Sequence, residues 1–228
     1  MKLSKNLCFA VALAAALAAN QSRAVDVVGG QTNVILDTDT LAAAANLTLD
    51  AVGGATIVPG DLAAGAGETS AAFPIDAAST LTYTPGDFLN TFSAGGTIEH
   101  NGTVGFNTPD GDAANDATVG DFSIRFDATR IGGDRSGFFV QSTTGIVAPL
   151  FDIQVTNVID LADALTIDGE LLVSAEFGQF LFDNSFSSTN LVGADVGAAQ
   201  VAATAIPEPG TLGLLAGLTA CVLGRRRR

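Results

Sequence analysis

Strict alternation of apolar and polar residues is the feature that most restricts the fold of this chain. In the stretch DFSIRFD, Phe122, Ile124 and Phe126 alternate with polar residues, and in LFDIQVTNV the residues Phe151 and Ile153 do the same. Successive side chains of a β-strand point to opposite faces of a sheet. A period of two therefore predicts strands that bury one face.

Shorter apolar runs occupy residues 25–120. NVIL, NLTLDAV, ATIV and LTYT are mostly bounded by Gly, Pro, Asp or Asn, and β-prone runs separated by turn residues favour an all-β domain. We therefore expect a single jelly-roll-like β-sandwich over residues 25–183, with most of the 14 phenylalanines in its core. The run LAAAA at 41–45 favours a helical turn only weakly.

The last part of this region allows two interpretations. The dipeptide Asp168-Gly169 is typical of a hairpin turn, whereas Ile167, Leu171 and Val173 share a parity that favours one strand running through Gly169. The following run, FGQFLFD, is expected to be the closing strand. Residues 184–206 are small, polar and weakly patterned, so we expect them to form a flexible stalk.

The first 24 residues have the parts of a secretory signal peptide. Lys2 and Lys5 give a positively charged start, residues 7–19 form an apolar run too short for a membrane span, and small residues follow. The preferred cleavage by signal peptidase is after Ala24, with Ala19 as the alternative. We therefore expect the domain to be exported.

The C-terminus carries a second apolar run. Residues 211–223 hold no charge and are followed by Arg225, Arg226, Arg227 and Arg228. A helix of this length reaches roughly 20 Å, short of the about 30 Å of a bilayer core. We expect the run to enter the membrane transiently, with the arginines held on the cytoplasmic side. A buried or amphipathic terminal helix is the alternative.

Pro207, Glu208 and Pro209 immediately precede that run. Proline disfavours helix in the residue before it, so the triplet is predicted to be extended and accessible. The triplet, the apolar run and the arginine cluster, together spanning residues 207–228, resemble the PEP-CTERM sorting signal of Gram-negative bacteria. The resemblance implies recognition by an exosortase-type membrane protease, cleavage at or near the triplet, and transfer to the cell surface or exopolysaccharide.

The resemblance carries no ligand over to the central domain, because proteins that share this tail have varied central domains. Residues 121–183, with GFFVQSTTG and LFDI, also resemble β domains often found ahead of this signal. What the domain binds must therefore be judged from its own residues.

Charge and cysteine content restrict the partners. Residues 25–206 hold 3 basic and 23 acidic residues, a net charge of −20. Such a charge argues against nucleic acid and anionic lipid as partners. Cys8 and Cys221 both lie in segments expected to be removed, so neither disulfides nor thiol chemistry is expected in the mature domain.

No catalytic constellation is found in the sequence. His100 is the single histidine, and its place in TIEHNG before a turn is typical of a solvated loop residue. No serine stands in a nucleophile-elbow context, and no glycine-rich phosphate loop opens a helix. We assign no catalytic residue and expect a protein that is not an enzyme.

Two acidic clusters suggest a metal. DTDT at 37–40 is short and is interpreted as a strand edge. NTPDGDAAND at 107–116 places Asp110, Asp112, Asn115 and Asp116 in one loop, the oxygen chemistry that calcium prefers, although the loop does not match an EF-hand. A hydrated hairpin loop is the default interpretation, and calcium is the sole cofactor under consideration.

The sequence thus predicts an exported protein of the outer surface or extracellular matrix of a Gram-negative-type bacterium. Its predicted role is structural or adhesive within exopolysaccharide or biofilm. The predicted partners are signal peptidase, an exosortase-type protease and extracellular polysaccharide, and no nucleic acid. One alternative is a calcium-dependent carbohydrate-binding module; another is a polysaccharide-active hydrolase.

Overall fold

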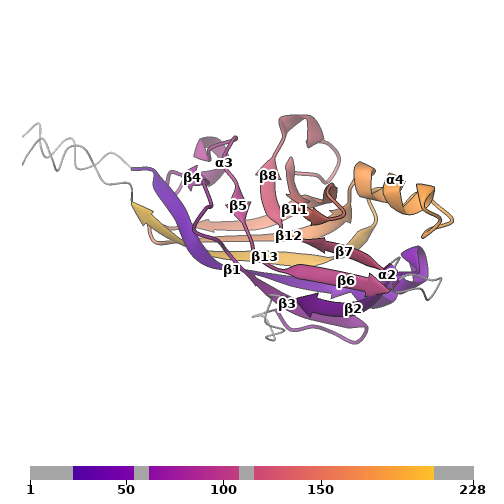
Figure 1. Ribbon diagram of the computed structural model, residues 1–228. Helices are drawn as coiled ribbons and strands as arrows, with labels where there is room; N and C mark the ends of the chain where they lie inside the picture. The colour runs from indigo at the N-terminus through magenta and orange to yellow at the C-terminus, as the bar shows by residue number, and fades with distance from the viewer. Residues whose placement is uncertain (1–22, 54–61, 108–115, 208–228) are drawn as a thin grey trace, which may run out of the picture.

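The computed structural model describes residues 23–53, 62–107 and 116–207, and within them the chain forms two antiparallel sheets (Figure 1). The larger sheet holds, in spatial order, β3 (Glu68–Pro74), β1 (Val25–Asp37), β13 (Asp195–Pro207), β12 (Ala164–Val173), β11 (Pro149–Asp160), β9 (Phe138–Gln141), β8 (Ser123–Phe126) and β5 (Ile98–Glu99), with β4 (Thr82–Tyr83) paired to β1. The smaller sheet holds β10 (Thr144–Gly145), β7 (Ala117–Gly120), β6 (Thr103–Asn107) and β2 (Thr48–Gly53). The helices are α2 (Thr38–Ala45), α3 (Phe88–Thr91), α4 (Ala175–Asp183) and the 3₁₀ turn η2 (Ala128–Arg130).

The expected all-β class is confirmed. The larger sheet curls into a half-barrel, and β6 and β7 of the smaller sheet face its inner side, so that the core lies between the two sheets. Side chains from both sheets point into this layer. The alternation in β12 is complete, with Leu165, Ile167, Gly169, Leu171 and Val173 all buried.

Strand β12 runs without interruption through Gly169, which settles the two interpretations of that stretch in favour of a single strand. Gly169 pairs with Val155 on β11 and with Ala199 on β13. A Cβ atom at this position would lie 2.8 Å from the carbonyl oxygen of Gln154. Glycine is therefore present because the neighbouring backbone comes close, and not because the chain turns.

The expectation of a flexible stalk over residues 184–206 is wrong, and the folded domain extends beyond residue 183. Residues 195–207 form β13, which lies in the middle of the larger sheet between β1 and β12. Its buried residues are small and alternate along the strand: Ala199, Val201, Ala203 and Ala205. Small side chains suit a crowded sheet centre, but they leave the segment with few large apolar residues, which is also typical of linkers.

The expectation of a closing strand at FGQFLFD is also wrong, because residues 175–183 form α4. Ser174 caps this helix: its hydroxyl oxygen accepts a hydrogen bond from the backbone N–H of Phe177 at 3.0 Å. Phe177 and Leu181, four positions apart, share the buried face. The cap and this spacing favour a helix over an extended run.

The acidic DTDT stretch spans a junction: Asp37 ends β1, as expected of a strand edge, and residues 38–40 begin α2. Asp37 is the N-cap, and its carboxylate accepts hydrogen bonds from the backbone N–H of Thr40 at 2.8 Å and from its hydroxyl at 2.6 Å. These bonds hold the pKa of the Asp37 carboxyl below its ordinary value. The alanines of LAAAA then extend the helix to Ala45.

The first and the last strand are hydrogen-bonded partners. Val25, the first residue of β1, is in register with Pro207, the last residue of β13, and both strand ends lie together at the left of Figure 1. Tyr83 of β4 pairs with Val25 and donates its phenolic hydrogen to the backbone oxygen of Leu161 at 2.7 Å. Among the described residues no helix combines the length and the apolar character needed to cross a bilayer.

Candidate functional site

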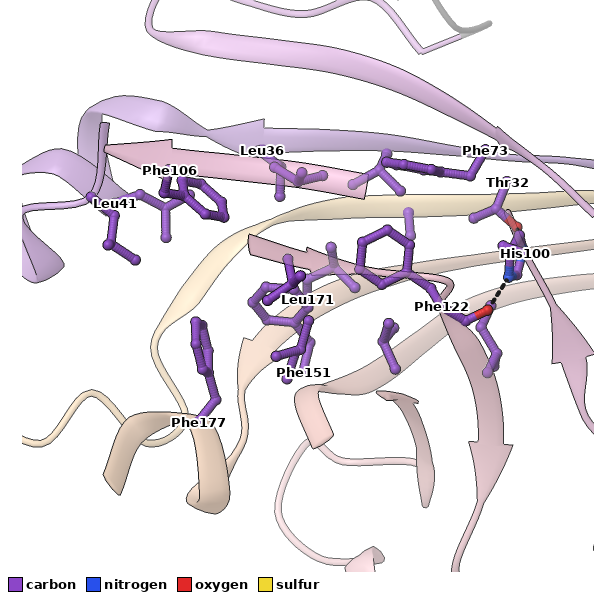
Figure 2. A pocket seen from close by; sticks show the side chains of 18 residues that line it. Thr32, Leu36, Leu41, Phe73, His100, Phe106, Phe122, Phe151, Leu171 and Phe177 are labelled. Atoms are coloured by element: carbon purple, nitrogen blue, oxygen red, sulfur yellow. Dashed lines mark hydrogen bonds between the residues drawn. The ribbon is translucent and has the colours of Figure 1, made fainter. Parts of the chain in front are cut away.

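A cavity of about 60 Å³ lies between the two sheets, and Figure 2 shows its side chains converging from both. The larger sheet contributes wall residues from β1, β3, β8, β9, β11, β12 and β13, and the smaller sheet contributes wall residues from β6 and β7. Leu41 of α2, Phe177 of α4 and three residues of connecting segments, Leu47, His100 and Phe122, complete the wall. Large aliphatic and aromatic side chains form most of this surface, and none of the described residues that line it carries a charged side chain.

The alternation of side chains along each strand determines which residues face the cavity. On β1, Thr32, Val34 and Leu36 face the cavity, while Asn33 between them points to the other side of the sheet. The facing residues of β6 are Val104 and Phe106, again two positions apart. The alternation that identified the strands in the sequence therefore also makes the cavity apolar.

His100 lies at one end of the cavity, and the expectation of a solvated loop histidine is wrong. Its side chain is 4% exposed. Nε2 lies 2.7 Å from Oγ1 of Thr32, and Nδ1 lies 3.1 Å from the backbone oxygen of Phe122. The residue directly follows β5 and forms an isolated antiparallel β-bridge with Ile75.

Burial sets the protonation state of His100. Desolvation lowers the pKa of its imidazole to about 4, against smaller opposing effects of the Phe122 carbonyl and of Glu99. The ring is therefore neutral near pH 7. Because a carbonyl oxygen only accepts, Nδ1 carries the hydrogen and donates it to Phe122, while Nε2 accepts from the hydroxyl of Thr32.

Among the described residues of its wall, the cavity offers water no free side-chain hydrogen-bond donor. Its volume would hold roughly four molecules at about 15 Å³ each, but a buried water needs two to four polar partners. The polar side chains of the wall, Thr32 and His100, already bond to each other and to Phe122. An empty apolar cavity of this volume costs about 1.4 kcal/mol of stability, on the scale of about 24 cal/mol per Å³.

A separate ion cluster joins α4 to the larger sheet. The guanidinium of Arg130 donates to the carboxylate of Asp152 at 2.7 Å and to that of Glu176 on α4. It also lies over the ring of Phe139, 4.5 Å from the centroid. Arg135 lies 3.7 Å from the other oxygen of Asp152. None of these charged residues lines the cavity. Their contacts hold α4 against β11 of the larger sheet.

Of the four predicted calcium ligands, only Asp116 lies within the described residues. It precedes β7 and lines a surface depression of about 370 Å³ with Ile146, Phe180 and Phe186. Asp110, Asp112 and Asn115 lie outside the described residues. In the part of the chain that the structure describes, no three His, Cys, Asp or Glu side chains are grouped so that they could hold a metal ion.

The predicted processing residues fall at the boundary of the described domain. Ala24 is partly buried and directly precedes β1. Pro207 is exposed and ends β13. Glu208, Pro209 and the arginines Arg225, Arg226, Arg227 and Arg228 lie outside the described residues, as does the apolar run 211–223.

Comparison with known proteins gives a likeness of fold. No protein-family model matches the chain, and no curated protein matches it. Among solved structures, the C-terminal domain of HtaA from Corynebacterium glutamicum is similar, with a TM-score of 0.50 over 79% of this chain and 99% of that chain. At 14% identity, this likeness supports the curled all-β architecture alone.

Sequence reasoning missed the cavity and the burial of His100. One signal was present, since Ile98 and His100 are two positions apart and therefore share a face of the same extended segment. A histidine on the same face as a core isoleucine is expected to be buried. The cavity itself has no sequence signal, because it depends on how side chains from nine strands meet.

Proposed function

We propose that this protein is an exported domain, sorted through its C-terminal signal to the outer surface or extracellular matrix, where it serves a structural or adhesive role. In this proposal signal peptidase removes residues 1–24, and an exosortase-type protease cleaves at or near Pro207-Glu208-Pro209. The mature product would be the β domain, with extracellular polysaccharide as its partner.

The observation that carries the proposal is the register of Val25 with Pro207. The residue after the predicted signal-peptide cleavage begins β1, and the first residue of the predicted sorting triplet ends β13. Both proposed cleavages therefore fall at the ends of the larger sheet. The strand residues from Val25 to Ile206 would all be kept. The two cleavage regions also adjoin the same end of the molecule (Figure 1).

The charge distribution supports the same proposal. The domain between the two cleavage regions carries a net charge of −20, so it repels anionic polymers and membranes unless cations intervene. Such a domain stays soluble outside the cell, and its carboxylates are available for bridging by divalent ions.

Mass spectrometry of the intact protein recovered from the native cell surface and medium tests the proposal. We expect a mass that corresponds to a start near Val25 and an end near residues 207–209. A variant with Glu208→Ala and Pro209→Ala should retain Arg228, whereas the control variant Pro74→Ala, at the end of β3, should be processed normally. A wild-type protein that keeps Arg228 would overturn the proposal.

One observation favours the alternative of a calcium-dependent carbohydrate-binding module. Asp116, at the end of the predicted calcium loop, shares its depression with the rings of Phe180 and Phe186, whose centroids are 6.0 Å apart. A carboxylate beside two aromatic rings can hold a metal-bridged sugar. Calcium titration by calorimetry tests this alternative. Calcium binding to the wild type that is lost in Asp116→Ala would support the module.

A further inference from the structure

Three large apolar side chains are exposed at the end of the domain where Val25 and Pro207 meet. Leu89 of α3 is 62% exposed, Leu161 in the turn after β11 is 53% exposed, and Ile206 near the end of β13 is 49% exposed. In Figure 1, α3 and the end of β13 both lie on the left side of the molecule. We call these three residues the terminal patch.

Hydrogen bonds hold the terminal patch around the turn between β11 and β12. The backbone N–H of Phe88 donates to the carboxylate of Asp160 at 2.7 Å. The backbone N–H of Ala205 donates to the backbone oxygen of Asp163 at 3.0 Å. Each residue of the patch is therefore either in this turn or next in sequence to a residue that is hydrogen-bonded to it. The patch belongs to one fixed region of the folded domain.

The chain beyond Pro207 indicates what covers the terminal patch. Single exposed apolar side chains are ordinary on protein surfaces, but here an uncharged apolar run, residues 211–223, follows close by in the sequence. Only residues 208–210 separate this run from Pro207. The four steps from residue 207 to residue 211 span at most about 14 Å. When the run enters a membrane, the end of β13 must therefore lie close to the membrane surface.

Charge at this end of the domain restricts the kind of membrane. Four acidic residues lie within two positions of a patch residue or in strand register with one: Asp26, Asp87, Asp160 and Asp163. Their carboxylates repel anionic head groups. The apolar side chains of the patch, in contrast, gain free energy when they leave water for the boundary between head groups and acyl chains. A bilayer surface without net charge fits both properties.

We propose that the terminal patch rests on the surface of a bilayer without net charge while residues 211–223 are in the membrane. The inference rests on the proposed sorting and on the membrane entry of that run. It adds the orientation of the domain before cleavage, with the end of β13 facing the bilayer. The triplet Pro207-Glu208-Pro209 is then held at the membrane surface, where a membrane protease can reach it.

Single tryptophans test the proposal, because the chain has none of its own. Variants of the full chain are reconstituted in vesicles of phosphatidylcholine with brominated acyl chains, which quench tryptophan fluorescence at short range. Leu215→Trp reports membrane entry of the apolar run, and Leu89→Trp reports contact of the patch. Val147→Trp is the control, because Val147 precedes β11 and lies about 36 Å from the Asp160 end of that strand. We expect a loss of fluorescence for the first two variants and none for the control.

The two reporters distinguish this inference from the proposed sorting. Quenching of Leu215→Trp without quenching of Leu89→Trp would overturn the inference and leave the sorting intact. An unquenched Leu215→Trp would contradict membrane entry, on which both proposals depend.

A second substitution separates contact of the patch from simple tethering. Leu161→Ser, introduced together with Leu89→Trp, should reduce the quenching, whereas Val147→Ser in the same background should leave it unchanged. Both substitutions are at exposed positions, so neither is expected to prevent folding. Undiminished quenching with Leu161→Ser would show that the tether alone brings Leu89 to the lipid, and the proposal would fail.

Discussion

Oγ1 of Thr32 lies 2.7 Å from Nε2 of His100, although the two residues are 68 positions apart in the sequence. The contact joins β1, the second strand from one edge of the larger sheet, to the segment after β5, the strand at the other edge. It can form because the half-barrel curls β3 and β1 back toward β5. The bridge between Ile75 and His100 lies beside it.

We expect the buried imidazole to make stability depend on pH. The pKa of His100 is about 4 in the folded protein and about 6.5 when exposed, so between these values the unfolded chain binds a proton that the folded protein does not. The free energy of unfolding therefore falls as the pH is lowered through this window, by up to about 3 kcal/mol, and the full contribution is present above about pH 6.5. Urea unfolding at about pH 7, 6 and 5 measures it.

The variant His100→Gln separates this effect from the titration of carboxylates. We expect its stability to change less than that of the wild type between about pH 6.5 and 5, a range above the ordinary pKa of carboxyl groups. Thr32→Val is the matched control, because it removes the hydroxyl and keeps the imidazole. Parallel pH profiles for wild type and His100→Gln would contradict a neutral buried histidine.

Arg130→Met is expected to destabilise the domain by about 3 kcal/mol, because it leaves the carboxylate of Asp152 buried without its main partner. The side chain of Asp152 is 2% exposed. Arg135→Met is the control, since Arg135 is 38% exposed at 3.7 Å from the same carboxylate, and it should cost less than about 1 kcal/mol. Chemical denaturation of both variants decides, and equal losses would show that the two arginines share the role.

Gly169→Ala should destabilise the larger sheet by about 2 kcal/mol, because the new methyl group meets Ile153 and the backbone of Gln154. Gly29→Ala serves as the control: nothing lies within 4 Å of its added Cβ, and the change should stay within about 0.5 kcal/mol. Thermal unfolding measures both. A neutral Gly169→Ala would mean that β11 and β12 are farther apart than the structure has them.

A chain that ends after residue 194 should not fold. It lacks β13, so β1 and β12 lose their common partner and the core loses Val196, Ala199 and Val201. A chain that ends after Pro207 keeps the whole sheet and should unfold cooperatively. Far-UV circular dichroism with heating distinguishes the two, and cooperative unfolding of the shorter chain would restore the interpretation of residues 184–206 as a stalk.

The sequence predicted the architecture best where apolar and polar residues alternate along a strand. Alternation in SIRF and in the first half of β11 identified these strands correctly, because large apolar residues mark the buried face. The same rule failed for β13, where the buried residues are alanines and valines and resemble a linker. It failed again at α4, where the Ser174 cap outweighed an apolar run that is also typical of a strand.

The candidate site was harder to predict than the fold. A cavity arises from the gap that remains when residues distant in sequence meet, and no local pattern records that gap. Burial of His100 depends in the same way on Thr32 and Phe122, which become its neighbours only after the sheet has curled.

The pairing of β13 with β1 on one side and β12 on the other has a mechanical consequence. A domain tethered through Pro207 and pulled from its far end carries the load along the axis of β13. The hydrogen bonds on both sides of the strand are then loaded in shear at the same time. They do not break one after another from one end. In the sorting proposed above, attachment would be through a central strand of the sheet and not through an edge strand.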